Sequence, residues 1–162
     1  MNIILDDWVK RIRHYMPKNL GKILEVGSLN VNGTIRDSFK ENEYESYMGI
    51  DMRAGKDVDI VVYSHELVRT FGKDSFDLVL SIATMEHDDR FWLTRKAINT
   101  VLKRNGFYIL SVPSINFHYH PYPHDYWRFT KPAVLSVMFE GYEVLDLADV
   151  GGNIICAIGK RL

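Results

Sequence analysis

The stretch Lys22-Ile-Leu-Glu-Val-Gly27 is a short apolar run that leads directly into a glycine. Such a run is typical of a buried strand that turns sharply at its carboxyl end, because glycine accepts backbone conformations that other residues avoid. A loop rich in Asn and Gly follows, and the pattern from Thr34 to about Lys40 predicts a helix. The chain therefore contains a strand–loop–helix unit at this point.

Outward from this unit, apolar runs of strand length alternate with amphipathic segments. We expect an initial helix from Asp6 and Asp7, which could cap it, to about Met16. Further predicted strands cover 47–50, 59–63, 76–81 and 107–112, and further predicted helices cover 65–71, 91–104 and 132–139. Alternating strands and helices predict parallel crossovers and a sheet that is covered on both faces.

The end of the chain breaks this alternation. Residues 142–150 and 153–160 are two apolar runs joined by Gly151-Gly152, which indicates a hairpin. The predicted fold is therefore α/β: a doubly wound, mostly parallel seven-stranded sheet of Rossmann-like type with an antiparallel C-terminal hairpin strand. We expect residues 1–162 to form a single domain, since domains commonly have about 100–150 residues or somewhat more.

Composition excludes several classes of protein. Twenty basic and 21 acidic side chains give a net charge of -1, which disfavours a dedicated nucleic-acid binder. Cys156 is the one cysteine, so no internal disulfide can form and a reducing compartment is expected. No apolar run reaches the roughly 18 residues of a membrane span, and residues 1–7 lack the features of a signal peptide. We predict a cytoplasmic protein without a membrane partner.

Residues at the predicted strand ends point to a nucleoside ligand. Asp51 ends the second strand 24 positions after Gly27, close to the offset of about 20 at which a carboxylate accepts hydrogen bonds from ribose. The loop lacks the second glycine that a pyrophosphate requires, since Leu29 occupies that position. Glu25 would also repel a pyrophosphate. A ribose acceptor beside an anionic first loop favours a cationic nucleoside such as S-adenosylmethionine.

The order of these motifs resembles the class I (seven-stranded) S-adenosylmethionine-dependent methyltransferases, and within them the small type 11 domains. The resemblance covers nearly the whole chain. It rests on Ile23-Leu-Glu-Val-Gly27, Met48-Gly-Ile-Asp51, Phe76-Asp-Leu-Val-Leu-Ser81 with Glu86-His87, Val101-Leu-Lys-Arg-Asn-Gly106-Phe107 and the terminal hairpin. Leu29 and Val31 stand where the family usually has glycines, Tyr63 stands near a frequent adenine-binding aspartate, and Asn105 replaces a glycine.

The resemblance implies a cofactor site for S-adenosylmethionine at the strand ends. Glu25 would lie near its ammonium group, Asp51 would bind the ribose, and Met52 would pack on the adenine. In this loop variant, Asn30 and Gly33 take over the work of the missing glycines. The full set of cofactor residues that we predict is Glu25, Gly27, Ser28, Asn30, Gly33, Asp51, Met52, Ser64, His65 and Ser81.

The segment 113–130 fits no period and carries six aromatic residues and three of the six histidines. Long loops on compact domains often carry function. The segment also resembles a His-Pro…Asp-Tyr-Trp-Arg-Phe-Thr stretch of similar proteins, and this resemblance implies a substrate-side wall, with Tyr126, Trp127 and Arg128 as substrate-binding residues. A structural interpretation also accounts for part of it: Trp127 and Phe129 would fill the core while Asp125 and Arg128 form an ion pair. A metal site built from His118, His120, His124 and Asp125 is the least favoured interpretation, so no metal is expected.

The candidate proton acceptors are His87, His120, His124 and Asp125, because histidine titrates near neutral pH. Glu86 could orient His87, or the pair could instead cap the following helix. We expect methyl transfer to an oxygen or nitrogen of a small molecule, sugar or glycan. The alternatives are a non-catalytic binding or partner subunit of the same fold and, less favoured, a metal-binding protein that uses residues 118–125. Selectivity could also come from a homodimer or a partner subunit.

Overall fold

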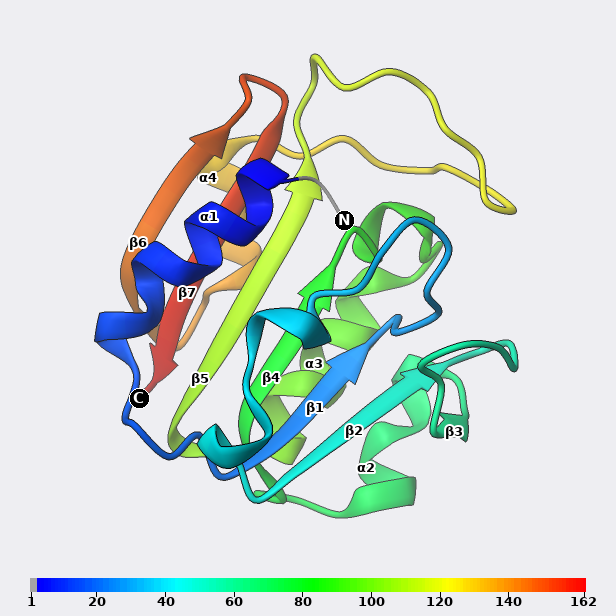
Figure 1. Ribbon diagram of the computed structural model, residues 1–162. Coiled ribbons are helices and arrows are strands. Elements are labelled where there is room, and N and C mark those ends of the chain that lie inside the picture. The colour runs from blue at the N-terminus through cyan, green and yellow to red at the C-terminus, as the bar shows by residue number, and fades with distance from the viewer. Residues whose placement is uncertain (1–2) are drawn as a thin grey trace.

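The computed structural model describes residues 3–162 (Figure 1). Residues 1 and 2, which belong to the segment without signal-peptide features, lie outside the described part. Within residues 3–162, seven strands form one sheet in the order β3-β2-β1-β4-β5-β7-β6. The strands are β1 (Lys22–Val26), β2 (Ser46–Asp51), β3 (Ile60–Val61), β4 (Phe76–Ile82), β5 (Leu102–Pro113), β6 (Tyr142–Val150) and β7 (Ile154–Arg161).

The pairing of the strands confirms the predicted fold class. β1 lies between β2 and β4, and both pairs are parallel. β5 is parallel to β4, whereas β7 is antiparallel to both β5 and β6. Strand order therefore reverses at β1 and β4, the point at which open α/β sheets bind their ligands beyond the carboxyl ends of the strands.

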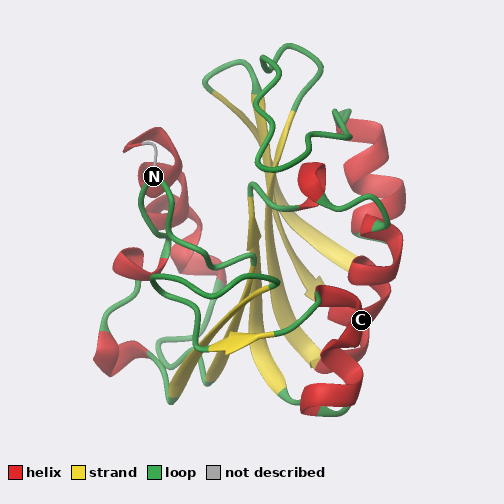
Figure 2. Cartoon of the chain, turned by 90° about the vertical axis from the view of Figure 1, so that its right-hand side faces the viewer, coloured by secondary structure: helices red, strands yellow, loops and turns green. Residues whose placement is uncertain are grey.

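Helices cover both faces of the sheet, which Figure 2 shows edge-on. One face carries α2 (Leu67–Phe71), α3 (Phe91–Val101) and α4 (Lys131–Ala133), the last continuing as a π-helical turn, Val134–Met138. The other face carries α1 (Ile3–Ile12), which buries Trp8, Val9 and Ile12. Each fully buried side chain of this size contributes about 1.5–3 kcal/mol, and the Trp8 indole also donates a hydrogen bond to Asp146 of β6 at 2.7 Å.

The predicted helix 91–104 ends at Val101, and two other predicted helices differ more from the structure. The first begins at Ile3, so Asp6 lies inside it and binds Lys10 and Ser38 in place of capping the helix. Residues 34–40 form only the 3-10 turn Arg36–Ser38. A helix of seven residues forms only with the support of tertiary contacts. Here the tertiary contacts accompany the 3-10 turn instead: the Arg36 guanidinium donates to the carbonyl of Tyr47 on β2 at 3.1 Å.

Strand bounds differ at two further places. β3 is shorter than the predicted 59–63. β5 begins at Leu102, and the predicted turn before residue 107 is an irregularity in its pairing with β4, where Asn105 has a φ of 62°. Asparagine tolerates this left-handed conformation better than most residues other than glycine. No helix within residues 3–162 has the length and apolar character to cross a membrane.

Candidate functional site

Gly27 allows the loops at the carboxyl ends of β1 and β4 to approach each other closely. Its φ is 79°, and a Cβ atom at this position would overlap the side chain of Thr84, which follows β4. The Gly27 amide donates to the carbonyl of Ile50 in β2 at 2.9 Å. The loops after β1, β2 and β4 therefore meet at one edge of the sheet.

Asn30 fixes the loop after β1 on the loop after β2. Its side-chain amide donates to Asp57 at 2.6 Å, its main-chain amide donates to Lys56 at 3.0 Å, and its side-chain oxygen accepts from the Gly33 amide at 2.9 Å. The end of the Leu29 side chain packs on Gly55, where a Cβ would require it to move. Asn30 and Gly33, which were predicted to replace the missing glycines, are thus bound to each other and fix the conformation of the loop.

Asp51 ends β2 with one carboxylate oxygen available. Oδ1 accepts from the amide of Arg53 at 2.9 Å, and Oδ2 has no hydrogen bond within residues 3–162. The carboxylate is half-buried, and Met52 beside it is 51% exposed. This pair presents a hydrogen-bond acceptor next to an apolar surface.

Glu25 is 5% exposed and lies within the sheet, where the Tyr47 hydroxyl donates to it at 2.7 Å. Burial raises the pKa of Glu25 to about 7, although the Tyr47 hydrogen bond and the charge of Arg36 act in the opposite direction. Glu25 is therefore a buried group already bound to Tyr47, and its contact with a ligand ammonium stays a prediction.

Other predicted cofactor residues differ in accessibility. Ser28 and Ser81 are buried, and the hydroxyl of each lacks a hydrogen bond within residues 3–162. The Ser64 hydroxyl is bound to Thr94 of α3 at 2.6 Å. His65 is exposed and stacks on Tyr63, with ring centroids 5.5 Å apart. His65 is accessible, whereas the serines are covered or bound, and the role of all four residues in cofactor binding stays a prediction.

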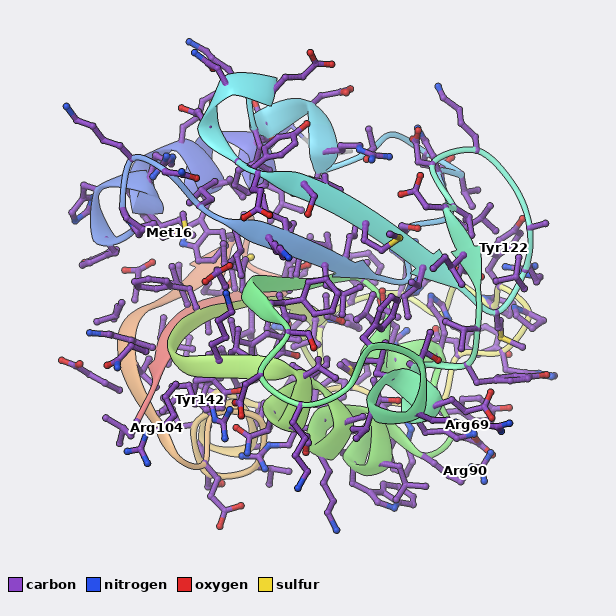
Figure 3. All side chains as sticks on the ribbon, turned by 90° about the horizontal axis from the view of Figure 1, so that it is seen from below. Met16, Arg69, Arg90, Arg104, Tyr122 and Tyr142 are labelled. Atoms are coloured by element: carbon purple, nitrogen blue, oxygen red, sulfur yellow. The ribbon has the colours of Figure 1, made fainter. Side chains whose placement is uncertain are left out.

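The segment 114–130 leaves β5 and extends over the same edge of the sheet (Figure 1). Its residue Tyr122 lies against the loop after β2, where the Arg53 guanidinium is 4.4 Å from the ring centroid (Figure 3). At the other end, the Trp127 indole donates to the carbonyl of Asp88 at 2.9 Å, and Phe129 is buried in the core. The structural interpretation of Trp127 and Phe129 is confirmed.

The predicted ion pair between Asp125 and Arg128 is also confirmed. The two guanidinium nitrogens lie 2.5 and 2.6 Å from the two carboxylate oxygens. This pairing holds the pKa of Asp125 well below its usual range. Asp125 is therefore unsuited to accept a proton. Arg128 also donates to the carbonyls of Phe117 and His118, and Trp127 packs against the core. A role of these two residues in substrate binding stays a prediction.

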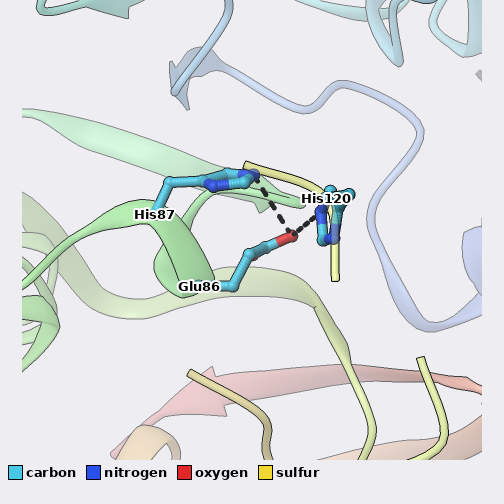
Figure 4. A group of neighbouring side chains, drawn as sticks. All are labelled: Glu86, His87 and His120. Atoms are coloured by element: carbon cyan, nitrogen blue, oxygen red, sulfur yellow. Dashed lines mark ion pairs between the residues drawn. The ribbon is translucent and has the colours of Figure 1, made fainter. Parts of the chain in front are cut away.

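Three side chains that follow β4 and β5 converge at this edge (Figure 4). The Glu86 Oε1 atom lies 3.6 Å from His120 Nε2 and 3.9 Å from His87 Nε2. The nearby Glu86 carboxylate raises the pKa of His120. The Glu86-His87 pair does not cap α3. Asp88 instead accepts from the amide of Arg90, the residue before α3, at 2.9 Å, and from the hydroxyl of Thr94 within α3.

The geometry does not assemble the metal ligands of the least favoured interpretation. Of His118, His120, His124 and Asp125, His120 alone belongs to a group of three candidate ligands within the described residues, and the other two members are Glu86 and His87. His118 stacks on Phe117, and His124 is exposed beside Tyr126. The sequence places Glu86 and His87 together, but nothing in it shows that His120 meets them.

Eight large apolar side chains are exposed along this edge. They belong to loops that follow β1, β2, β3 and β5 or to the short β3 itself: Val31, Met52, Val61, Tyr63, Ile115, Tyr119, Tyr122 and Tyr126. Gathered apolar surface of this kind marks sites that bind a ligand or a partner. Two hollows of about 440 and 450 Å³ lie at the opposite edge, near the starts of β1 and β4, where open α/β sheets do not bind their ligands.

Solved structures of known proteins share this architecture. A 1,6-didemethyltoxoflavin-N1-methyltransferase from Burkholderia thailandensis, solved with 1,6-didemethyltoxoflavin and S-adenosylhomocysteine, is 15% identical with a TM-score of 0.73, over 97% of this chain and 76% of its own. A putative S-adenosylmethionine-dependent methyltransferase from Listeria monocytogenes is 12% identical with a TM-score of 0.71, over 98% of both chains. The cyclase SpnF is 12% identical with a TM-score of 0.73, over 96% of this chain and 80% of its own.

These likenesses, together with the strand order, define the class: the chain has the class I methyltransferase fold. No protein-family model matches the sequence, and no curated protein matches it. The presence of a cyclase among the similar structures shows that the fold alone does not decide the reaction.

Proposed function

We propose that this protein transfers a methyl group from S-adenosylmethionine to an oxygen or nitrogen of a small-molecule acceptor. The observation that carries the proposal is the carboxylate of Asp51, whose Oδ2 lacks a hydrogen bond within residues 3–162 at the end of β2. A half-buried carboxylate with one unpaired oxygen is suited to accept the hydroxyl groups of a ribose. The class I methyltransferase fold and the apolar rim of the same edge support it.

The residues present fit such a cofactor in part. Asp51 would hold the ribose, exposed Met52 would cover the adenine, and the main chain around Gly27 would border the methionine portion. S-adenosylmethionine, when bound, supplies a methyl group on a sulfonium centre. Glu25 lies beneath the loop with its carboxyl group bound to Tyr47, so it would act on the cofactor only through its charge, at a pH above its pKa of about 7.

The acceptor would lie under the segment 114–130. The exposed rings of Tyr119, Tyr122 and Tyr126 suit a planar or sugar-like molecule by stacking. The similar methyltransferase from Burkholderia thailandensis was solved with a small heterocycle, which favours a small molecule here too; a sugar or glycan acceptor stays a prediction. Holding the acceptor in line supplies much of the rate, and an imidazole of this edge (His87, His120 or His124) would take its proton.

Calorimetric titration with S-adenosylmethionine and S-adenosylhomocysteine tests the cofactor site. We expect both to bind, and Asp51→Asn to weaken binding at least about 100-fold, since hydrogen bonds to a charged group contribute about 1.5–3 kcal/mol each. Asp7→Asn, an exposed carboxylate on α1, is the matched control and should bind like the wild type. Unchanged affinity in Asp51→Asn would show that the ribose assignment is wrong.

A second function is favoured by the loop after β1. Leu29 is packed on Gly55, and no helix follows the loop at residues 34–40, so this part of the site departs from an open cofactor loop. If neither cofactor form binds, the protein acts instead as a non-catalytic partner subunit with this fold. A cytoplasmic location and assembly as a homodimer also stay predictions.

A further inference from the structure

We propose that Glu86, His87 and His120 form a binding site for one divalent transition-metal ion, with Zn²⁺ as the reference ion. The proposal concerns the isolated protein and does not rest on methyl transfer. Two imidazoles and one carboxylate are a donor set that zinc and other first-row divalent ions accept, and three protein ligands leave coordination positions open for water or a small molecule.

The three donor atoms already face one another. His87 Nε2, His120 Nε2 and the Glu86 carboxylate lie within 4.8 Å of one another, and Figure 4 shows both rings directed at the same oxygen. Ligand bonds of about 2.0–2.2 Å place neighbouring ligand atoms roughly 3.3 Å apart in a tetrahedral site. The separations of 3.6 and 3.9 Å from Glu86 to the imidazoles approach this value, so small side-chain rotations would close the site.

The other nitrogen of each imidazole is bound in the manner that metal ligation requires. His87 Nδ1 lies 2.5 Å from the carbonyl oxygen of His124. His120 Nδ1 lies 3.2 Å from the carbonyl oxygen of His118 and 3.2 Å from an oxygen of Asp125. All three partners are acceptors, so each Nδ1 carries the hydrogen and each Nε2 directs its lone pair at Glu86 when the ring is neutral.

Glu86 supplies an independent observation. It is 1% exposed, and its Oε2 is buried without any hydrogen bond within the described residues 3–162. Burying an unpaired polar atom is costly, and more so for an ionised one. The Glu86 main chain is fixed, because its carbonyl accepts from the amides of Tyr126 and Trp127. A metal ion between the Glu86 carboxylate and the two imidazole lone pairs would neutralise this buried negative charge.

Asp125 acts as a positioning residue in this proposal. Arg128 holds its carboxylate in place, and the carboxylate in turn accepts the His120 amide at 2.8 Å as well as facing His120 Nδ1. Outer partners of this kind typically change metal affinity by 10–100-fold. The buried ion pair of the segment 114–130 therefore orients one ligand of the site.

Direct metal binding tests the proposal with the full chain, freed of any histidine tag and treated with a chelator. Zn²⁺ is titrated by calorimetry and in competition with a chromophoric chelator, and Co²⁺ is added separately to record its visible absorption. We expect one equivalent of either ion in the wild type. Glu86→Gln and His120→Asn should each weaken binding at least about 100-fold, and Asp125→Asn about 10–100-fold.

His118→Asn is the matched control, since this histidine lies in the same segment but its ring stacks on Phe117 outside the cluster. It should bind Zn²⁺ like the wild type. Thermal unfolding of each metal-free variant separates loss of the site from loss of the fold. Substoichiometric binding by the wild type, or equal affinity in folded Glu86→Gln, His120→Asn and His118→Asn, would overturn the proposal, and a proton would then bridge Glu86 and His120.

Discussion

Replacing Glu25 by glutamine tests the electrostatics at the centre of the sheet. The glutamine keeps the size of the side chain and an oxygen that can accept from Tyr47, but it removes the ionisation. Burial raises the pKa of Glu25 from 4.5 to about 7. The folded protein therefore holds a proton on Glu25 between these two values, whereas the unfolded chain has released it.

The sign and size of the effect follow from this difference. Because the folded-state pKa is the higher one, the contribution of Glu25 to stability is fully present below pH 4.5 and is lost as the pH rises through about 7. Each unit of difference corresponds to 1.36 kcal/mol, so the loss amounts to about 3 kcal/mol. Glu25→Gln does not titrate and should escape this loss.

Denaturant unfolding at pH 5, 6, 7 and 8 measures the effect. We expect Glu25→Gln to match the wild type near pH 5 within about 1 kcal/mol and to exceed its free energy of unfolding by about 2–3 kcal/mol at pH 8. Tyr47→Phe is the companion variant. Loss of the hydroxyl that donates to Glu25 should raise the pKa of Glu25 further, so the loss of stability should occur at a higher pH than in the wild type. A constant difference between Glu25→Gln and the wild type at every pH would refute the reasoning.

Three further predictions concern the fold. Gly27→Ala should lower the free energy of unfolding by at least about 2 kcal/mol, because the φ of 79° costs about 1–2 kcal/mol for a residue with Cβ and that atom overlaps Thr84; wild-type stability in denaturant would contradict this. Ile12→Ala should cost about 2–5 kcal/mol, since the side chain is fully buried between α1 and the sheet, and a loss below 1 kcal/mol would show that α1 packs loosely. Cys156 should resist thiol reagents until the protein unfolds, because it is buried and its pKa is raised to about 12; fast labelling of the native protein at pH 7.5 would disprove this.

The sheet could be predicted from the sequence because its strands carry their own signals. Runs such as Lys22–Val26 and Phe76–Ile82 are apolar enough to require burial on both faces, and the glycines at 151 and 152 mark the hairpin. Residues 34–40 were misread because their amphipathic pattern is real, yet contacts with α1 and β2 decide their conformation. In residues 34–40 the local sequence pattern predicts which side chains are buried, whereas tertiary contacts determine the backbone conformation.

The site was less predictable, because accessibility depends on what covers a residue. Asp51 was found from the end of its strand, whereas Ser28 and Ser81 were predicted from motif position and lie buried. The meeting of Glu86 with His120 joins residues 34 positions apart in the sequence. Only the path of the segment 114–130 brings them together, and that path has no periodic signal.

If Asp51 binds a ligand as proposed, the path of this segment also bears on how that ligand reaches it. The base of the segment is fixed by the bonds from Tyr126 and Trp127 to Glu86, whereas residues 121–123 at the tip make no hydrogen bond within residues 3–162 and touch the facing loop through Arg53 and Tyr122. An exposed contact of this kind contributes about 0.5–1 kcal/mol. At ~1 kcal/mol, roughly one molecule in six has this contact broken at any moment. Ligand exchange should therefore take place at the tip, with the base and its cluster of side chains undisturbed.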